Sequence, residues 1–247
     1  MLEDSNKQLG SRQASTSTSS ATGRFGSAFW ERLWRSAGIQ SLGCFILAYF
    51  IYPHQPEVGA STDALASFYT GNSTRIFIAA ALSGLGVLNL MWFAAAIRTT
   101  LADAQQDGWG AAVTASSATF GGLFLLIISL VAVLAYSVAG SGNQAFTSGM
   151  NDLAWVCWVL TSFPRAMLIM SPAFGLWRAG MISNSLFAVG VAAVVLVLLG
   201  GTTWVNGGFW APDGVYSRLV SPIIGIVWIL VVSRVLLTRS SAMNSGW

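Results

Sequence analysis

Charged residues are scarce in this sequence. Only 9% of its 247 residues are Asp, Glu, Lys or Arg, whereas 54% are hydrophobic. Soluble domains average about 25% charged residues, and a soluble fold with so few charges would have little to keep it dispersed. The shortage therefore disfavours a soluble fold and favours a membrane protein, whose apolar runs of about 20 residues each cross a bilayer.

Residues that bind metals or form disulfides are scarcer still. The chain has two cysteines, Cys44 and Cys157, and one histidine, His54. Both cysteines lie inside apolar runs without CxxC spacing, so we expect buried thiols. A single histidine excludes a bis-histidine haem within the chain, and the His and Cys clusters that bind zinc or copper are missing. The sequence predicts no metal and no cofactor.

Motifs for catalysis and for nucleic-acid binding are also missing. There is no HExxH, no phosphate loop and no Ser/His/Asp set beyond the lone His54. The net charge is +3, but no basic stripe with interleaved aromatics is present, so we expect no nucleic-acid partner. An enzyme is disfavoured on these grounds. An enzyme that acts on a lipophilic substrate through acids at the outer face remains conceivable.

The order of polar and apolar segments predicts the organisation of the chain. Residues 1–27 are polar and rich in Ser, Thr and Gly, which predicts a disordered cytoplasmic tail. Residues 28–35 mix aromatic and basic side chains, as an amphipathic helix lying in the interface does, with Trp30 and Trp34 as anchors. A six-helix transmembrane domain over 36–239 and a cytoplasmic tail over 240–247 follow. The six predicted spans are 36–52, 74–97, 111–139, 153–176, 182–203 and 216–237.

The distribution of basic residues predicts the orientation. With the N-terminus in the cytoplasm, nine of the 12 Lys and Arg residues lie inside, Arg75 and Arg218 lie outside, and Arg165 lies within a span. The predicted fold is therefore all-α, a polytopic six-transmembrane-helix bundle with both termini cytoplasmic.

Two outer segments are expected to form a cap. Between the first two spans, Ser61 or Thr62 could begin a short helix with Asp63 in its first turn and Tyr69 on its apolar face. Between the last two spans lies a Gly-rich loop that carries Trp204, Trp210 and Asp213. That loop either closes over the bundle or forms an interfacial aromatic belt.

Three stretches have a recognisable pattern. They are an outer helix ending in Tyr (GASTDALASFYTGNSTR), a Gly-rich span closing in Trp-Phe (SGLGVLNLMWFAAAIRTTL), and Arg178 with Gly180 at an inner turn (WRAGMISNSLFAVGVAA). This pattern resembles a family of uncharacterised bacterial, chiefly actinobacterial, multi-pass membrane proteins. The resemblance implies the topology and a bacterial host, hence a bacterial cytoplasmic membrane. It implies no functional residue.

Arg165 is the main candidate for function. It lies 13 residues from Asp152 and 12 from Trp177, roughly 20 Å from either end of its apolar run at 1.5 Å per residue. A charge at such a depth costs about 3 kcal/mol and marks a functional site by default. None of the nine acids lies inside a span: they are Glu3, Asp4, Glu31, Glu57, Asp63, Asp103, Asp107, Asp152 and Asp213. The polar residues expected to hydrogen-bond Arg165 are Gln40, Asn89, Ser117, Tyr136 and Ser162.

The prolines of the same run predict a broken or kinked fourth helix. Pro164 precedes Arg165 and Pro172 follows it, and each removes a backbone donor. Broken helices often line binding sites in transporters. Asp152, near the start of the run, is expected to cap this helix. The candidate ligand-binding residues are Arg165, Pro164, Asp152, Trp158 and Asn89, and the candidate outer-cap residues are Asp63, Tyr69, Trp204, Trp210 and Asp213.

Three functional hypotheses follow. The leading one is a protein that binds or translocates a small molecule or ion at a mid-membrane site around Arg165. The second is a non-enzymatic accessory subunit of a larger membrane complex, with Arg165 paired across an interface. The third is an intramembrane enzyme for a lipophilic substrate that uses outer-face acids. Arg165 is alternatively structural, bound to backbone carbonyls freed by the prolines and to water. The expected partners are membrane lipids, a small anionic ligand, and a second copy or a complex subunit.

Overall fold

The computed structural model describes residue 34, residues 36–139, residue 141 and residues 143–244. The chain divides into two units, Met1–Trp34 and Arg35–Trp247, and all the helices below belong to the second. The predicted tail 1–27 and interfacial helix 28–35 lie outside the described residues, apart from Trp34.

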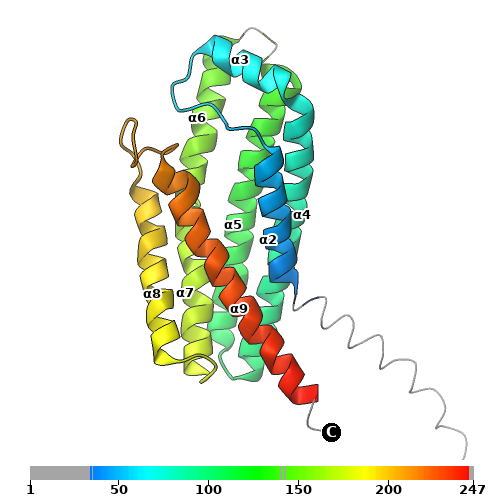
Figure 1. Cartoon of the computed structure of the whole chain (residues 1–247), viewed down its shortest axis with the longest axis vertical. Helices are drawn as coiled ribbons and strands as arrows, with labels where there is room; N and C mark the ends of the chain where they lie inside the picture. Colours follow the sequence, from blue (N-terminus) through cyan, green and yellow to red (C-terminus); the bar gives the residue numbers. More distant parts are fainter. Residues whose placement is uncertain (1–33, 35, 140, 142, 245–247) are drawn as a thin grey trace, which may run out of the picture. The chain divides into compact units, whose positions relative to one another are not determined.

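The described residues form helices and turns, and contain no strand. In chain order (Figure 1) the elements are α2 (Ala37–Ile51), α3 (Thr62–Gly71), α4 (Ser73–Asp103), α5 (Asp107–Val133), the π-helical turn η1 (Leu134–Val138), α6 (Gln144–Leu160), α7 (Ser162–Arg178), α8 (Asn184–Leu199), the 3-10 turn η2 (Gly200–Thr202), the π-helical turn η3 (Tyr216–Val220) and α9 (Ser221–Asn244).

Five of these helical segments are long and apolar enough to cross a membrane. They are Ser73–Asp103, Asp107–Val138, Ala145–Arg178, Asn184–Thr202 and Tyr216–Thr238. The remaining apolar helix, α2, has 15 residues, which is short for a bilayer core of about 30 Å. Length and hydropathy thus identify an all-α, multi-pass membrane protein.

Each predicted span corresponds to helical structure, but several boundaries differ; α4, for example, ends at Asp103 and not at residue 97. Helix α6 begins at Gln144, well before residue 153, because Asn143 caps it by accepting a hydrogen bond from the Phe146 amide (3.3 Å). Helix α9 continues to Asn244, into the segment predicted as a tail. These predicted boundaries followed hydropathy, and a helix can continue past the end of its apolar run.

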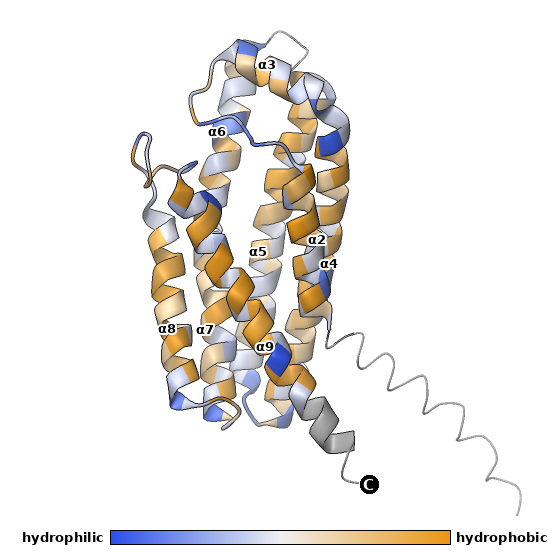
Figure 2. Cartoon of the chain, viewed as in Figure 1, coloured by the Kyte–Doolittle hydropathy of each residue, from blue (hydrophilic) through white to orange (hydrophobic). Residues whose placement is uncertain are grey.

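The segment Ala145–Arg178 lies at the centre of the bundle. In its most apolar window 61% of the residues are buried, against 28–39% in the other four spans. Its second half, α7, contacts α5, α8 and α9. The other spans leave most of their apolar residues exposed, as lipid-facing helices do. Figure 2 shows this apolar surface as orange along α8, α9 and α2, with paler or blue residues on upper α6 and at both ends.

Neighbouring helices approach closely at glycines. Helix α4 packs between α2 and α5, while α9 runs from the upper end of α8 to the lower end of α2 (Figure 1). A methyl group built on Gly86 of α4 would lie 2.7 Å from the ring of Phe45 of α2. One built on Gly190 of α8 would lie 2.6 Å from Trp228 and 3.0 Å from Ala173. Small residues at such contacts let membrane helices pack without a cavity.

The end of the bundle where α3 lies, called the α3 end below, has its own apolar core. Its buried members come from α3, α4, α5, η1 and α6. They are Leu65, Tyr69, Ile76, Ile127, Val131, Leu134, Ala139, Ala154 and Cys157. The predicted short helix is present as α3, and the Ser61 hydroxyl accepts a hydrogen bond from the Ala64 amide (3.4 Å). This core fixes α3 across the ends of the longer helices.

Two glycines of α4, two residues apart in the sequence, give a test of helix packing. Replacing Gly86 by Ala should destabilise the protein by about 1–3 kcal/mol, because the new methyl overlaps Phe45. Replacing Gly84 by Ala should be neutral or stabilise by up to about 1 kcal/mol, because no atom lies within 4 Å of its new methyl. Thermal unfolding in detergent measures both. Equal effects of the two changes would contradict the α2–α4 contact.

Candidate functional site

The central segment is interrupted at one residue, Thr161. Helix α6 ends at Leu160 and α7 begins at Ser162. Pro164 has no amide hydrogen to donate to the Leu160 carbonyl, so one helical hydrogen bond is missing there. The neighbouring bonds remain: the Thr161 amide donates to the Cys157 and Trp158 carbonyls (3.1 Å each), its hydroxyl donates to the Trp158 carbonyl (2.6 Å), and the Arg165 amide donates to the Thr161 carbonyl (3.0 Å). The expected effect of Pro164 is therefore limited to a one-residue turn, and Pro172 lies inside α7 without ending it.

Arg165 uses this interruption to hold its side chain inside the bundle. The residue is only 8% exposed. Its Nε donates to the Thr161 carbonyl (3.4 Å), its Nη2 donates to the Ser162 hydroxyl (3.0 Å), and its guanidinium carbon lies 4.8 Å from the centre of the Trp158 ring. Its Nη1 is buried and has no hydrogen-bond partner. Among the described residues no carboxylate forms an ion pair with it.

The neighbouring helix α8 shows the level at which Arg165 lies in the bundle. Helices α7 and α8 run antiparallel: Gly190, near the middle of α8, faces Ala173, whereas Gly200, at its end, faces Ser162. Arg165 is eight residues from Ala173, roughly 12 Å along the helix at 1.5 Å per residue. It therefore lies level with the last turn of α8, towards the α3 end. Its mid-membrane depth stays a prediction, and the 34-residue segment that carries it is much longer than the neighbouring 19-residue segment of α8 and η2.

Of three nearby serines, only Ser162 contacts the guanidinium group. Ser221 lies near Ser162: a methyl group built on Gly200 would be 2.8 Å from the Ser162 hydroxyl oxygen and 3.0 Å from that of Ser221. The carbonyl oxygen of Ser217 accepts a hydrogen bond from the Trp158 ring nitrogen (3.1 Å). The Ser221 hydroxyl is buried and has no partner. We call Arg165, Trp158, Ser162, Ser217 and Ser221 the arginine–tryptophan site.

A second arginine lies on the neighbouring tryptophan of α6. The guanidinium carbon of Arg218 is 4.7 Å from the centre of the Trp155 ring, and its Nη2 donates to the Gln55 carbonyl (3.3 Å). Its Nε is buried without a partner. The sequence identified Arg218 only as a basic residue outside the membrane. The signal that points to it is the pair Trp155 and Trp158, three residues apart and so on one face of a helix.

The segment 53–60, called the strap below, crosses the α3 end of the bundle and is tied down along its length. The Pro56 and Glu57 carbonyls accept hydrogen bonds from Trp155 (2.9 Å) and Asn151 (3.3 Å). The Val58 and Gly59 amides donate to Asp213 and Asp152, both at 3.2 Å. The carboxylates of Asp152 and Asp213 thus hold the strap in place.

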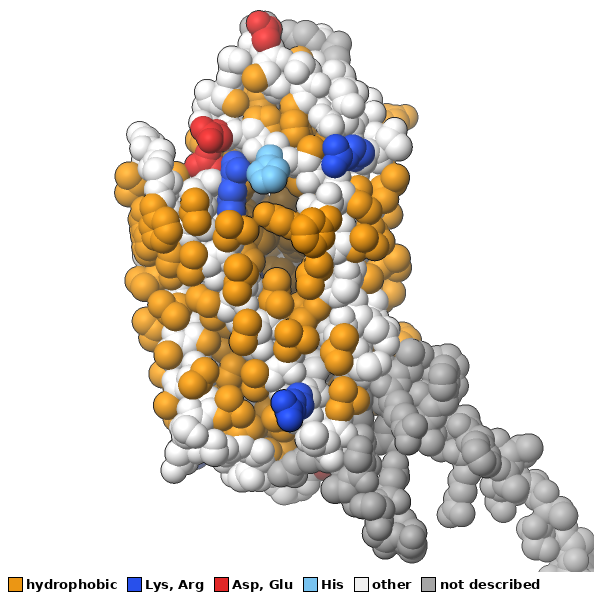
Figure 3. Space-filling view, viewed as in Figure 1, with side chains coloured by type: hydrophobic (Ala, Val, Ile, Leu, Met, Phe, Trp, Pro, Cys, Tyr) orange, Lys and Arg blue, Asp and Glu red, His pale blue; other side chains and the backbone are white. Residues whose placement is uncertain are grey.

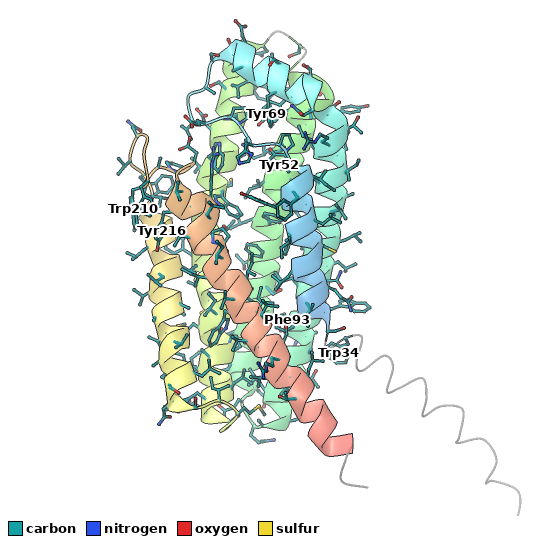
Figure 4. The ribbon with its side chains drawn as sticks, viewed as in Figure 1. Trp34, Tyr52, Tyr69, Phe93, Trp210 and Tyr216 are labelled. Carbon is teal, nitrogen blue, oxygen red and sulfur yellow. The ribbon has the colours of Figure 1, made fainter. Side chains whose placement is uncertain are left out.

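Asn151 of α6 joins the strap to α3. Its side-chain oxygen accepts hydrogen bonds from the Tyr69 hydroxyl (2.8 Å) and from the Gln55 side chain (3.2 Å). Tyr52 and Tyr69 both lie beneath α3 in Figure 4. Burial, and next the charge of Asp152, raise the pKa of Tyr69 above its ordinary value of 10.0, although the hydrogen bond with Gln55 lowers it. Asn151 and Gln55 were absent from the sequence prediction.

The structure separates several residues that the sequence grouped with Arg165. Asn89 donates to the Leu85 carbonyl of its own helix (2.9 Å) and does not hydrogen-bond to the arginine–tryptophan site. Asp152 does not cap α6, because Asn143 does. Of the polar neighbours expected for Arg165, only Ser162 contacts it: Gln40 bonds to Ser36, Asn89 bonds to its own helix, the Ser117 hydroxyl is buried without a partner, and Tyr136 is exposed.

The loop 203–215 does not close over the site. The Trp204 and Trp210 ring nitrogens donate to the Gly201 and Thr202 carbonyls (3.0 and 2.9 Å), and Trp210 packs on Tyr216 at 4.5 Å (Figure 4). The loop therefore folds back on its own end of α8, and Trp204 is exposed. Asp213 reaches the strap, while Asp63 is exposed in the first turn of α3. Of the two parts of the predicted outer cap, α3 lies across this end of the bundle, and the strap crosses the same end (Figure 1).

The site is chemically a set of hydrogen-bond donors. Arg165 Nη1, Arg218 Nε and Ser221 Oγ are buried donors without acceptors, and the two nearby acids, Asp152 and Asp213, bind strap amides. In the described part of the chain no cluster of three His, Cys, Asp or Glu residues could hold a metal. Cys44 and Cys157 are free thiols. Such an arrangement suits an anion, which accepts hydrogen bonds, and it offers no base for catalysis.

The surface beside the strap is hollowed. Figure 3 shows a recess below the single histidine, His54, in the gap that Figure 1 shows between α2 and α9. Its rim is mostly apolar in that view. The recess opens sideways, onto the lipid-facing side of the bundle.

No protein-family model, no curated protein and no solved structure matches the chain.

The raised pKa of Tyr69 gives a test of the contact between α3 and α6. When folding raises the pKa of a tyrosine, the neutral phenol contributes its full stabilisation below about pH 10, the pKa in the unfolded chain. This contribution to the free energy of unfolding is lost as the pH rises further. The thermal midpoint of the wild type should therefore fall more steeply between about pH 9 and pH 11 than that of Tyr69→Phe, which has no ionisable hydroxyl.

At neutral pH the same variant should be less stable by about 1 kcal/mol, since Asn151 loses a hydrogen bond. If the thermal midpoints of the wild type and of Tyr69→Phe fell equally with pH in the alkaline range, the pKa of Tyr69 would not be raised by folding. Its buried contact with α6 would then be contradicted.

Proposed function

We propose that this chain is a multi-pass membrane protein that binds a small anionic molecule or ion at the arginine–tryptophan site. One observation carries the proposal: Arg165 is buried, keeps its Nη1 without a partner, and forms no ion pair among the described residues. The ligand would supply the missing acceptor and the missing negative charge.

The energetics favour a bound anion over an empty site. A buried donor without an acceptor costs about 1–3 kcal/mol, and a buried charge without a counter-charge costs several. Contact with the Trp158 ring returns about 2 kcal/mol when the pair is desolvated. The contacts to Thr161 and Ser162 satisfy two of the guanidinium nitrogens but no charge. The remaining cost is what an anion would remove.

The competing functions receive less support. An accessory subunit that pairs through Arg165 would need the side chain to face outward, and it faces inward. An enzyme would need free acids beside a pocket, and Asp152 and Asp213 accept hydrogen bonds from strap amides. Translocation would need a polar path beyond the site, and the next buried residues of α7 are mostly apolar: Ala166, Leu168, Ile169, Ala173 and Leu176. The geometry favours binding from the α3 end.

The topology is part of the proposal. We infer six spans, with α2 completing the five long ones, and both termini in the cytoplasm. One feature of the sequence supports this orientation: nine of the 12 Lys and Arg residues precede α2 or lie in the C-terminal halves of α4, α7 and α9. The α3 end would then face outward. The resemblance described above supports a bacterial cytoplasmic membrane as the location.

The topology predicts which side of the membrane two serines face. In a variant without Cys44 and Cys157, Ser67→Cys on α3 should react with a membrane-impermeant maleimide added to intact cells. Ser185→Cys at the α7–α8 turn should react only after the cells are opened. Both side chains are exposed, so accessibility within the protein is matched. Labelling of Ser185→Cys in intact cells would contradict the orientation.

The ligand proposal is tested by thermal unfolding of the purified protein in anions of different kinds. The thermal midpoint of the wild type is measured in sodium phosphate, sulfate, acetate and chloride at the same ionic strength. Some of these anions should raise the midpoint and others should leave it unchanged. An anion present at 100 times its Kd would stabilise by about 2.7 kcal/mol. Arg165→Met should abolish that stabilisation, and Arg234→Met, at an exposed arginine of α9, should retain it.

The same variant separates a ligand site from a structural arginine. Without a stabilising anion, Arg165→Met should be as stable as the wild type or more so, because Met fills a similar volume and removes an uncompensated charge. A large loss of stability under every condition would mean that Arg165 serves the fold. Native mass spectrometry of the wild type, which also reports the oligomeric state, should find the bound anion. A wild type that carries none and gains stability from none would refute the proposal.

A further inference from the structure

The two arginines of the α3 end are held against one helix face. Arg165 lies over Trp158 and Arg218 lies over Trp155. The two tryptophans are three residues apart, which is a rise of about 4.5 Å along α6. Ser217, next to Arg218 in sequence, contacts Trp158. Elements far apart in the chain thus bring two cations to adjacent turns of α6.

Neither cation is neutralised by an acid. Among the described residues no ion pair involves Arg165 or Arg218. The carboxylates of Asp152 and Asp213, at the same end, accept hydrogen bonds from Gly59 and Val58. Two cations at one end of the bundle without a counter-charge favour a bound anion nearby.

The unsatisfied groups of this region are all able to donate. They are Arg165 Nη1, Arg218 Nε and Ser221 Oγ, and each is buried without a partner. Ser221 lies three residues after Arg218, on the same side of the η3–α9 helix. It also lies beside Ser162, which binds Arg165. Three donors from two separate helices suit a ligand with several acceptor oxygens better than a halide, which has a single acceptor atom.

We propose that Arg165 and Arg218 belong to one site that binds a phosphate group, with the Ser221 hydroxyl as a further donor. The inference rests on the proposed function and narrows its ligand class to a tetrahedral oxyanion. Arginine suits this role because its planar fork offers parallel donors to two oxygens of a phosphate.

The phosphate group has two sources that the same chemistry would recognise. Free phosphate or a phosphate ester would enter from the aqueous side, past the strap, whose Gln55 carbonyl already contacts Arg218. A phospholipid headgroup would enter through the recess between α2 and α9, which opens towards lipid (Figure 3).

The free-phosphate arm uses the full chain in detergent. Calorimetric titration with sodium phosphate, at an ionic strength fixed by sodium chloride, gives Kd for the wild type, Arg165→Met, Arg218→Met and the double variant. Each single change should weaken binding by about tenfold or more, as expected for a lost charge-assisted hydrogen bond. If the two arginines share one anion, the double change should weaken binding by less than the product of the two single effects.

The lipid arm uses native mass spectrometry of the protein released from nanodiscs. The discs contain phosphatidylcholine alone or phosphatidylcholine with phosphatidylglycerol. A lipid-derived ligand would appear as a retained phosphatidylglycerol on the wild type that both arginine variants lose. Retention of phosphatidylglycerol, or titration by free phosphate, supports the site and identifies the source.

Control variants separate site effects from effects on the fold or on net charge. Arg75→Met removes a charge at the same end, from an exposed arginine that bonds to the Ile51 carbonyl, and should leave Kd unchanged. Arg165→Lys and Arg218→Lys keep the charge but lose the fork, so each should fold and bind with intermediate affinity. They keep the test decisive if a methionine variant does not fold.

The outcomes distinguish this inference from the function on which it rests. If phosphate or phosphatidylglycerol binding depends on Arg165 but not on Arg218, the shared site is refuted and anion binding stands. If acetate or chloride binds through Arg165 while neither phosphate source does, the restriction to a tetrahedral oxyanion is refuted and anion binding stands. If no anion binds the wild type, both proposals fall together.

Discussion

A polar backbone group inside a membrane bundle must find a partner, because no water of the bulk phase reaches it. Pro164 cannot donate to the Leu160 carbonyl, and a one-residue turn at Thr161 separates the two helices of the most buried segment. The Arg165 side chain folds back onto this turn, to the Thr161 carbonyl and the Ser162 hydroxyl. The turn and the buried cation therefore lie together.

The strap explains why the cations remain without acids. Asp152 and Asp213 lie at the α3 end, where they could in principle pair with Arg165 or Arg218. Instead each accepts a hydrogen bond from a strap amide. Those amides belong to a segment without regular structure and need acceptors when it is packed on the bundle. The acids therefore fix the backbone, and the charge of the arginines is left for contact with tryptophan rings and with a ligand.

Local sequence features predicted the local structure well. Apolar runs placed the long helices, Ser61 predicted the start of α3, and Pro164 predicted the interruption of the central segment. The failures concern partners that are distant in sequence. The strap contacts join Gln55 to Asn151 and to Arg218, across 96 and 163 residues, and no local pattern reports such a pairing. The aromatic loop 203–215 was expected over the site because hydropathy does not indicate the direction in which a loop folds.

The sequence by itself determined that the chain is helical and made to lie in a membrane, because hydropathy and helix-breaking residues act over a few turns. It also singled out Arg165, because a charge inside an apolar run is costly wherever the run lies. Only the tertiary structure decided that this charge lies level with the last turn of α8, since that level depends on how a 34-residue segment is aligned with its 19-residue neighbour. It alone brought Arg218 to the adjacent tryptophan, because helix packing, and not spacing along the chain, sets which side chains meet.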